Sequence, residues 1–161
     1  MPKKQDWRDI VASSLGWEQA HANLESAARD LAANLRGKRP DGLPHSPWEL
    51  LEHIRITHHD LVEFCTDPDY VEKLEWPRDY WPAKPEPPSA DAWEKSIAAF
   101  QRDRDELARF TTETDIDLTT KIPRGTGQTY LRTIILAVDH ASYHVGQLVL
   151  ARRLLGAWPA K

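Results

Sequence analysis

The sequence predicts an all-α fold, a four-helix bundle, for this chain of 161 residues. Apolar residues recur at helical spacing in four long segments, and stretches rich in Gly and Pro separate these segments. Apolar residues make up 40% of the chain and charged residues 29%, which is an ordinary balance for a globular protein. A chain of this length can bury a core without disulfides or metals, so we expect a single domain over residues 1–161.

The first helix is expected over Asp6–Leu35. Gly16 is a weakness inside it that could introduce a bend, and Gly37 is a suitable stop. Residues 37–45 then have the composition of turns. The helical prediction rests on apolar residues at helical spacing: Ile10, Trp17, Leu24, Ala28, Leu31 and Leu35.

The second helix has the clearest start in the sequence. Ser46 is a good N-cap, Pro47 suits the first helical position, and Glu49 completes a Ser-x-x-Glu capping box. The helix should end near Thr66-Asp67-Pro68. Its buried stripe is expected to contain Leu50, Leu51, Ile54, Leu61, Val62 and Cys65.

Residues 67–88 contain six prolines, which argue against both a helix and a central strand. A flexible linker would be richer in Gly and Ser and would lack Trp76, Tyr80 and Trp81. We therefore expect an ordered crossover that packs onto the bundle. A link of this length also allows the second and third helices to run parallel.

A third helix is expected over Ser89–Thr111, followed by a polar loop over residues 112–128. The last helix should follow Thr126–Thr129, continue to Leu155 and stop at Gly156. It is apolar on nearly every side, so we expect it to be the most buried helix.

Charge and cysteine content exclude several classes of protein. The formal net charge of −4 and the lack of a basic helix argue against a nucleic-acid-binding protein. The N-terminal residues contain no signal-peptide pattern, and no apolar run approaches the length that crosses a bilayer. A single cysteine, Cys65, cannot form an internal disulfide, and its place on the apolar stripe suggests a buried structural thiol. We expect a cytoplasmic protein.

Two histidines of the last helix form the strongest candidate for chemistry. His140 and His144 are four residues apart, so their side chains project from one helix face about one turn apart. This spacing suits two imidazoles that bind one metal ion. Ala141 follows His140, so the His-Glu-x-x-His motif of metalloproteases is absent.

A third ligand would have to come from another helix, and spacing alone leaves the choice open. His53 lies at the flank of the second helix's apolar stripe, which favours it modestly. His21 is the rival, because it shares the inward face of the expected first helix with Trp17 and Leu24. The other histidines are less suitable: His45 precedes the helix, His58 lies nearer the centre of the apolar stripe, and His59 lies away from it.

Four motifs, in this order along the chain, resemble the DinB-like proteins, also called YfiT-like metal-dependent hydrolases. The resemblance covers nearly the whole chain, including the Pro-rich crossover. The motifs are Trp17-Glu-x-x-His21, Arg39-Pro-Asp-Gly-Leu-Pro-His45-Ser-Pro-Trp48, Leu50-Leu-Glu-His53-Ile and Asp139-His-Ala-Ser-Tyr-His144-Val-Gly-Gln147.

The resemblance implies an up-down-down-up four-helix bundle, frequent homodimerisation and a three-histidine metal site that binds nickel or zinc. Residue by residue, it assigns the metal ligands to His53, His140 and His144. It leaves the activity open. Some members transfer a low-molecular-weight thiol, as cosubstrate, to an electrophile, whereas others are described as hydrolases.

We therefore expect a metal-dependent enzyme, a thiol S-transferase or a hydrolase, that acts on a small molecule. Asp60 and Asp139 are candidates for partners of the ligand histidines, and Gln147 could orient a substrate. The catalytic residues themselves are not identified by the sequence. The alternative is a non-catalytic stress-response protein that binds a metal or another ligand, which a fourth protein ligand closing the site would favour.

Overall fold

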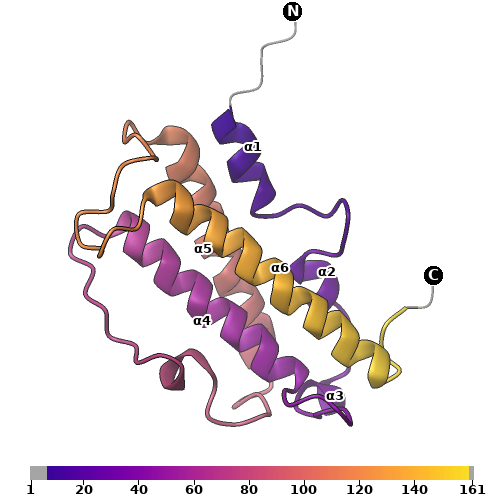
Figure 1. The fold of residues 1–161 in the computed structure, drawn as a ribbon. Helices are drawn as coiled ribbons and strands as arrows, with labels where there is room; N and C mark the ends of the chain where they lie inside the picture. The colour runs from indigo at the N-terminus through magenta and orange to yellow at the C-terminus, as the bar shows by residue number, and fades with distance from the viewer. Residues whose placement is uncertain (1–6, 160–161) are drawn as a thin grey trace, which may run out of the picture.

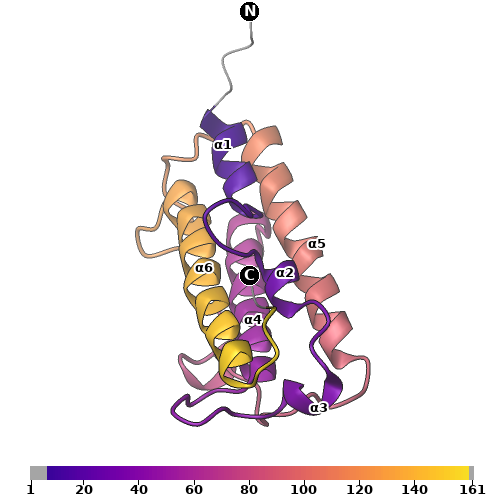
Figure 2. The ribbon, with the colours of Figure 1, turned by 90° about the vertical axis from the view of Figure 1, so that its right-hand side faces the viewer.

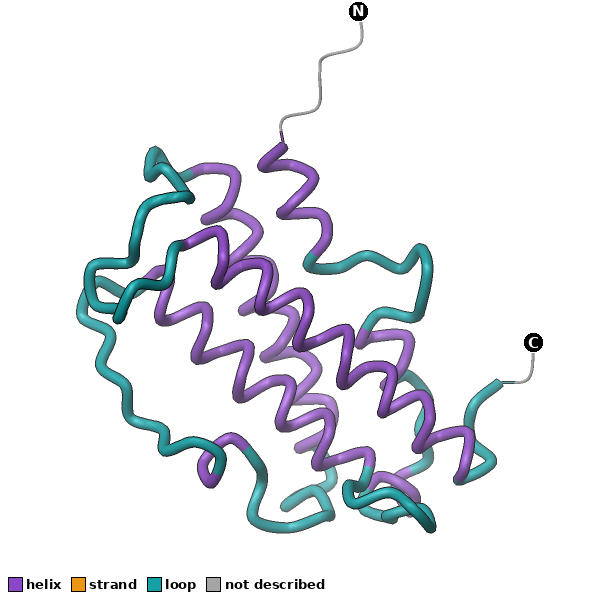
Figure 3. Tube along the Cα trace, viewed as in Figure 1, coloured by secondary structure: helices purple, strands orange, loops and turns teal. Residues whose placement is uncertain are grey.

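Three long helices form the body of the protein in the computed structural model, which describes residues 7–159. These helices are α4 (Pro47–Thr66), α5 (Ala92–Glu113) and α6 (Tyr130–Leu154). α4 packs against both of the others. It runs in the same direction as α5 and opposite to α6, as both ribbon views show (Figures 1 and 2). Helices joined by loops make up the described chain, with one isolated bridge between Lys121 and Thr129 (Figure 3).

The prediction of one continuous helix over Asp6–Leu35 is wrong for the part of it that the structure describes; Asp6 itself lies outside that part. Three short helices replace it: α1 (Trp7–Ser14), α2 (Leu24–Ala28) and α3 (Ala33–Arg36). α1 packs on α5, and α2 packs on α6 and α5. Together they cover the side of the bundle where a fourth long helix was expected.

Local capping and a distant arginine fix the two ends of α2. The side chain of Asn23 accepts a hydrogen bond from the amide of Ser26, which caps α2 at its start. The guanidinium of Arg152, in the last turn of α6, donates to the carbonyls of Ala27 and Arg29. Arg152 is only 4 % exposed, and these bonds satisfy its buried N–H groups and the carbonyls where α2 ends.

α4 begins where the sequence predicts. The hydroxyl of Ser46 accepts from the amide of Glu49, and the Glu49 carboxylate accepts from the amide of Ser46, so the capping box is complete. The same hydroxyl donates to the carbonyl of Pro85, which ties the end of the crossover to the start of α4.

The crossover between α4 and α5 is ordered along the outside of the bundle, with one 3₁₀ turn, η1 (Arg78–Tyr80). Tyr80 is buried and Trp81 half-buried, although the segment is neither strand nor long helix. The predicted ordered crossover is therefore confirmed.

α6 is long and apolar enough to cross a membrane by length and composition alone, contrary to the expectation from the sequence. Helices in the cores of water-soluble proteins meet the same criterion, so this is weak evidence for a membrane. Only 33% of its most apolar stretch is buried. The prediction that the last helix is the most buried one is therefore wrong: 9 of the 25 residues of α6 are buried, against 11 of the 20 residues of α4, because only one face of α6 packs on the bundle.

Candidate metal centre

Three histidine rings from two helices meet in the groove between α4 and α6. His53 comes from α4, and His140 and His144 come from successive turns of α6. The Nε2 atom of His53 lies 3.1 Å from Nε2 of His140 and 3.2 Å from Nε2 of His144. The three candidate ligand atoms all lie within 4.8 Å of one another, which is close enough to share one metal ion.

The crossover orients the ring of His53. Nδ1 of His53 lies 2.7 Å from the backbone carbonyl of Tyr80, which can only accept, so Nδ1 carries the proton. The indole of Trp81 stacks on the His53 ring at 3.8 Å with an interplanar angle of 2°. His45 stacks on Trp81 at 4.0 Å, so the indole is held between two imidazoles. The hydrogen bond to Tyr80 and the stacked indole of Trp81 therefore restrict rotation of the His53 ring.

Asp60 connects this arrangement back to α4. Its carboxylate accepts a hydrogen bond from the hydroxyl of Tyr80 and another from that of Tyr70, each at 2.8 Å. Burial and the bond to Asp60 raise the pKa of Tyr80 well above its usual value, so the tyrosine remains a donor. Asp60 therefore acts on His53 through Tyr80 and forms no hydrogen bond with the imidazole itself.

His144 is oriented by its own helix. Its Nδ1 lies 2.7 Å from Oε1 of Gln147, three residues further along α6. With an amide oxygen at this position, Nδ1 of His144 also carries the proton, and Nε2 has a free lone pair. The exposed ring of Tyr143 lies edge-on to the other side of His144, with ring centroids 4.9 Å apart.

These hydrogen bonds make the centre suitable for a cation. His53 and His144 both direct an Nε2 lone pair at the other across 3.2 Å, and neither nitrogen has a proton to donate. Only His140 can offer a hydrogen to this group of three nitrogens. Neutral imidazoles with converging lone pairs are the ligand set that zinc, nickel and related divalent ions prefer. The residues present therefore fit a metal ion.

Burial keeps the three rings neutral. It lowers the pKa of His53 to about 4, and burial together with the neighbouring histidines lowers that of His140 to about 3. Burial also lowers the pKa of His144. Each of the three rings therefore keeps one unprotonated nitrogen at neutral pH, so a second proton does not compete with a metal ion.

The remaining histidines are not brought to this centre. His21 is exposed, its Nδ1 lies 2.8 Å from the carbonyl of Ala22, and it borders a small hollow between the α1–α2 link and α6. His59 is exposed and pairs with Asp103. His58 is buried against Phe100, and neither of its ring nitrogens has a hydrogen-bond partner in the part of the chain that is described.

The four residues that the sequence suggested around the ligands therefore have different positions. Gln147 contacts His144 directly, and Asp60 acts on His53 at one remove. Asp139 lies on the outward face of α6 and is exposed. It forms no hydrogen bond or ion pair among residues 7–159. His21 lies in the link between α1 and α2, away from the ligands.

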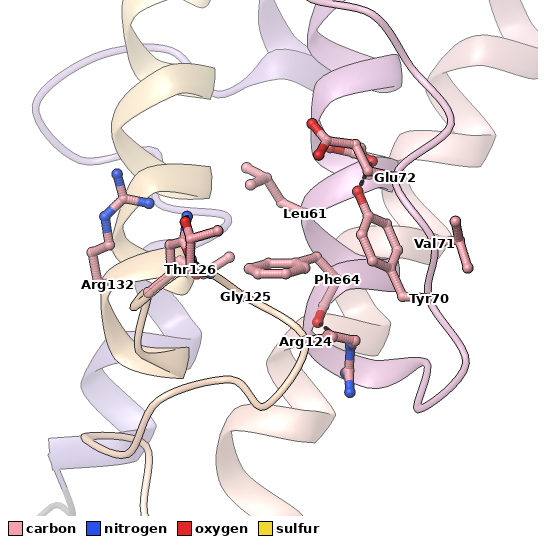
Figure 4. Close-up of a pocket in the computed structure, with 12 residues that line it drawn as sticks. Leu61, Phe64, Tyr70, Val71, Glu72, Arg124, Gly125, Thr126 and Arg132 are labelled. Carbon is pink, nitrogen blue, oxygen red and sulfur yellow. Dashed lines mark hydrogen bonds between the residues drawn. The ribbon is translucent and has the colours of Figure 1, made fainter.

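A hollow of about 410 Å³ continues the same groove toward the start of α6. The rings of Phe64 and Tyr70 and the loop residues Gly125 and Thr126 border it (Figure 4). Thr133, at its edge, is seven residues before His140 on α6, which is two helical turns or about 10 Å. A molecule in this hollow could therefore reach toward the histidines along the groove.

Both signs of charge line this hollow. Asp60 and Glu72 contribute carboxylates, and Arg124 and Arg132 contribute guanidinium groups. Arg124 donates to the carbonyls of Phe64 and Cys65 at the end of α4, which holds the loop before α6 in place. Arg132 is exposed at the rim.

Reasoning from the sequence did not identify Tyr80, Trp81, His45 or Tyr143 as part of this site. The crossover residues were noticed only as aromatic side chains in an ordered segment. The signal that could have found them is their position in a Pro-rich segment that must pass along the α4–α6 groove. Nothing in the spacing of the sequence identifies the carbonyl of Tyr80 as the partner of His53.

Cys65 is the described chain's one cysteine and is buried without a disulfide. Burial raises the pKa of its thiol to about 12, so the thiolate form is negligible at neutral pH. The interpretation as a structural thiol agrees with this environment.

Comparisons with known proteins bear on the family. Residues 17–148 match the model of the DinB superfamily, a span that includes all three histidines and the whole crossover. No curated protein and no solved structure matches the chain. The matched span is well over half of the sequence, and the described chain is helical as that family is. The chain therefore belongs to the DinB superfamily.

Proposed function

We propose that this protein is a metal-dependent enzyme that acts on a small molecule, with His53, His140 and His144 as ligands of one zinc or nickel ion. The observation that supports it best is the pair of facing lone pairs on His53 and His144, each produced by a hydrogen bond to the ring's other nitrogen. A structural role for these rings would be better served by a donor facing an acceptor.

The chain's own residues would hold and shield the reacting centre. Tyr80 and Gln147 fix the ring tautomers, and Trp81 covers one face of His53. His140 is only partly buried, so a substrate can approach from its side. A divalent ion bound by the three imidazoles supplies Lewis acidity, which lowers the pKa of a thiol or water that reaches it.

The hollow next to the centre supports a small-molecule substrate. Its volume is at the low end of the range for ligand pockets, and it combines apolar rings with a few charged groups. We propose that it holds the non-reacting part of the substrate while the reacting atom lies at the histidines. Between the two reactions, we favour transfer of a small thiol to an electrophile, with hydrolysis as the alternative. A single inert cysteine suits a thiol-rich cytoplasm.

The test starts with protein purified without a metal-affinity column. Elemental analysis should find about one divalent ion per chain, and this should be lost in His140→Ala and kept in His59→Ala, which changes an exposed histidine of α4.

The loaded protein is then assayed with cysteine as the thiol and chlorodinitrobenzene as the electrophile, and separately with a nitrophenyl ester. Turnover that needs the thiol supports the transferase, and turnover without it supports the hydrolase. Equal turnover in His140→Ala would reject the metal-dependent mechanism. Stoichiometric metal with no turnover of either substrate would favour a non-catalytic binding protein.

A further inference from the structure

Two aromatic rings next to the three histidines are open to solvent. Trp76, in the crossover, is 65 % exposed, and Tyr143, on α6, is 64 % exposed. Among residues 7–159 these are the two most exposed Trp, Tyr or Phe side chains, and the next is Trp7 at 46 %. A single exposed ring is ordinary on a protein surface, whereas exposed apolar surface gathered at one site is typical of a binding surface.

Each of the two rings contacts a ligand histidine. The ring centroid of Trp76 lies 6.5 Å from that of His53, and the ring centroid of Tyr143 lies 4.9 Å from that of His144. The rings of the two histidines are themselves only 4.5 Å apart. A molecule that lies against Trp76 or Tyr143 is therefore next to the metal centre.

The third aromatic ring at the centre, Trp81, is arranged differently. Its indole is stacked between His45 and His53, so the protein itself occupies both of its faces. Within the described part of the chain, no ring is stacked on Trp76 or Tyr143, whose ring contacts are tilted or edge-on. Trp81 holds a ligand in place, whereas the other two rings have surface free for a bound molecule.

The chemistry of these rings favours one class of molecule. The face of an indole or a phenol ring carries negative charge and its edge positive charge. An aromatic ring that has lost electron density to nitro or carbonyl groups is therefore attracted when it stacks on Trp76 or Tyr143. A ring of this kind is also electrophilic, so a thiolate attacks its carbon atoms.

The two rings also lie apart from the charged hollow. Thr133, at the edge of the hollow, is seven residues before His140 on α6, and Tyr143 is three residues after it. Along α6 the charged hollow and the Tyr143 ring therefore lie on opposite sides of His140. Two different substrates, one polar and one aromatic, could approach the histidines from these two sides.

We propose that Trp76 and Tyr143 bind the electrophile and that it is an electron-poor aromatic molecule. This inference rests on the proposed thiol transfer, with the polar part of the thiol in the charged hollow. With chlorodinitrobenzene, the carbon–sulfur bond forms and the carbon–chlorine bond breaks. Chloride leaves with the bonding electron pair, and the proton of the thiol passes to solvent. A small molecule fits better than a protein partner, because a macromolecule that covers both rings would also block the approach to the histidines.

Binding without turnover gives the first test. The probe is meta-dinitrobenzene, which is electron-poor but carries no leaving halide, added to the zinc-loaded protein. Among the indole N–H signals of the seven tryptophans, that of Trp76 should shift in the NMR spectrum and that of Trp7 should not. Trp76→Ala and Trp7→Ala assign the two signals. Nitrocyclohexane, which has no aromatic ring, should leave the Trp76 signal nearly unchanged.

Variants measure the contribution of each ring. Trp76→Ala and Tyr143→Ala should each weaken meta-dinitrobenzene binding by about 2- to 10-fold in equilibrium dialysis, which is the effect of losing one aromatic pair. Trp76→Phe and Tyr143→Phe should retain most of the affinity, and Trp7→Ala all of it. Each variant should still bind one zinc ion per chain, so that a lost metal does not explain the result.

Turnover gives the second test. In Trp76→Ala and Tyr143→Ala, the KM for chlorodinitrobenzene should rise by the same factor and kcat should change little, because the rings bind the ring system and not the reacting bond. Turnover of iodoacetamide, an electrophile without a ring, should equal that of the wild type.

The two tests separate this inference from the proposed function. Dinitrobenzene binding at Trp76 in a protein that turns over no thiol would reject the transferase and retain the aromatic site. Thiol-dependent turnover with unchanged dinitrobenzene affinity in both alanine variants would retain the transferase and overturn the aromatic site. Equal shifts of the Trp76 signal with nitrocyclohexane would also overturn it, since the site would then not select aromatic molecules.

Discussion

His53 and His58 lie on the same helix, five residues apart, and both are almost completely buried, at 1 % and 2 % exposure. Their surroundings differ completely. Both ring nitrogens of His53 face polar atoms: the carbonyl of Tyr80 and the Nε2 atoms of two other histidines. Neither nitrogen of His58 has a partner among the described residues, and its ring packs against Phe100.

The comparison teaches that burial on a helix does not make a histidine a metal ligand. The partners do, and they come from segments far away in the sequence. The crossover supplies Tyr80 and Trp81 to His53, whereas α5 supplies an apolar ring to His58. The predictions below test whether the two histidines differ in function as they do in surroundings.

The largest effect is expected when a ligand is removed. His144→Ala should weaken zinc or nickel binding by more than about 100-fold. Loss of a residue that only hydrogen-bonds a metal ligand already costs up to about 100-fold in affinity, and loss of the ligand itself should cost more. His58→Leu should change the affinity by less than about 2-fold, because His58 is not one of the three histidines whose ligand atoms converge. Isothermal titration calorimetry of the metal-free variants measures both. A loss of affinity in His58→Leu as large as in His144→Ala would contradict the assignment.

The next effect concerns the partners of His53. Asp60→Asn should lower metal affinity by about 10- to 100-fold. The hydroxyl of Tyr80 loses its charged acceptor, so Tyr80 is held less firmly and its backbone carbonyl positions Nδ1 of His53 less well than in the wild type. Tyr70→Phe removes the other bond to Asp60 and should have a smaller effect in the same direction. The same titrations, accompanied by circular dichroism to verify folding, check this. Unchanged affinity in Asp60→Asn would show that the crossover does not position His53.

Acid should reveal His58. Burial lowers its pKa in the folded protein to about 4, against about 6.5 when unfolded. Between these values the unfolded chain binds one more proton, so stability is full above pH 6.5 and decreases as the pH falls toward 4. From pH 7 to pH 5, this single group should cost about 2 kcal/mol.

Urea unfolding of the metal-free protein at pH 7 and pH 5 measures this cost. His58→Leu should lose about 2 kcal/mol less than the wild type over this interval. It should also be more stable at pH 7, because no unpaired ring nitrogen is then buried. The ligand histidines titrate in both proteins and cancel in the difference. An identical pH dependence in the two proteins would show that His58 is not buried as a neutral ring.

The smallest effect is expected at the start of α4, two turns before His53. Ser46→Ala removes the side-chain cap and the bond to Pro85, and should lower the free energy of unfolding by about 1–2 kcal/mol. Metal affinity should change little, since His53 keeps its contacts with Tyr80 and Trp81. Urea unfolding and titration together measure the two quantities. A large loss of affinity here would mean that the cap, and not the crossover, positions the ligand.

Several features could be predicted from the sequence because they depend on residues close together in the chain. The capping box of Ser46 and Glu49 sets the first turn of α4 by local hydrogen bonds. The four-residue spacing of His140 and His144 places both rings on one face of α6 by helix geometry alone. The prolines and aromatic residues of the crossover indicate an ordered, non-helical segment.

Only the tertiary structure decided the rest, because the deciding contacts join residues far apart in the sequence. Arg152 binds the carbonyls where α2 ends, so the apolar periodicity before Leu35 does not become one helix. The choice between His21 and His53 depends on which ring α6 meets, and α6 packs along α4. The direction of the His53 lone pair depends on the carbonyl of Tyr80, 27 residues away. A side-chain pattern cannot encode that bond, since any residue at position 80 has the same backbone carbonyl. Only the backbone conformation of the crossover decides where this carbonyl points.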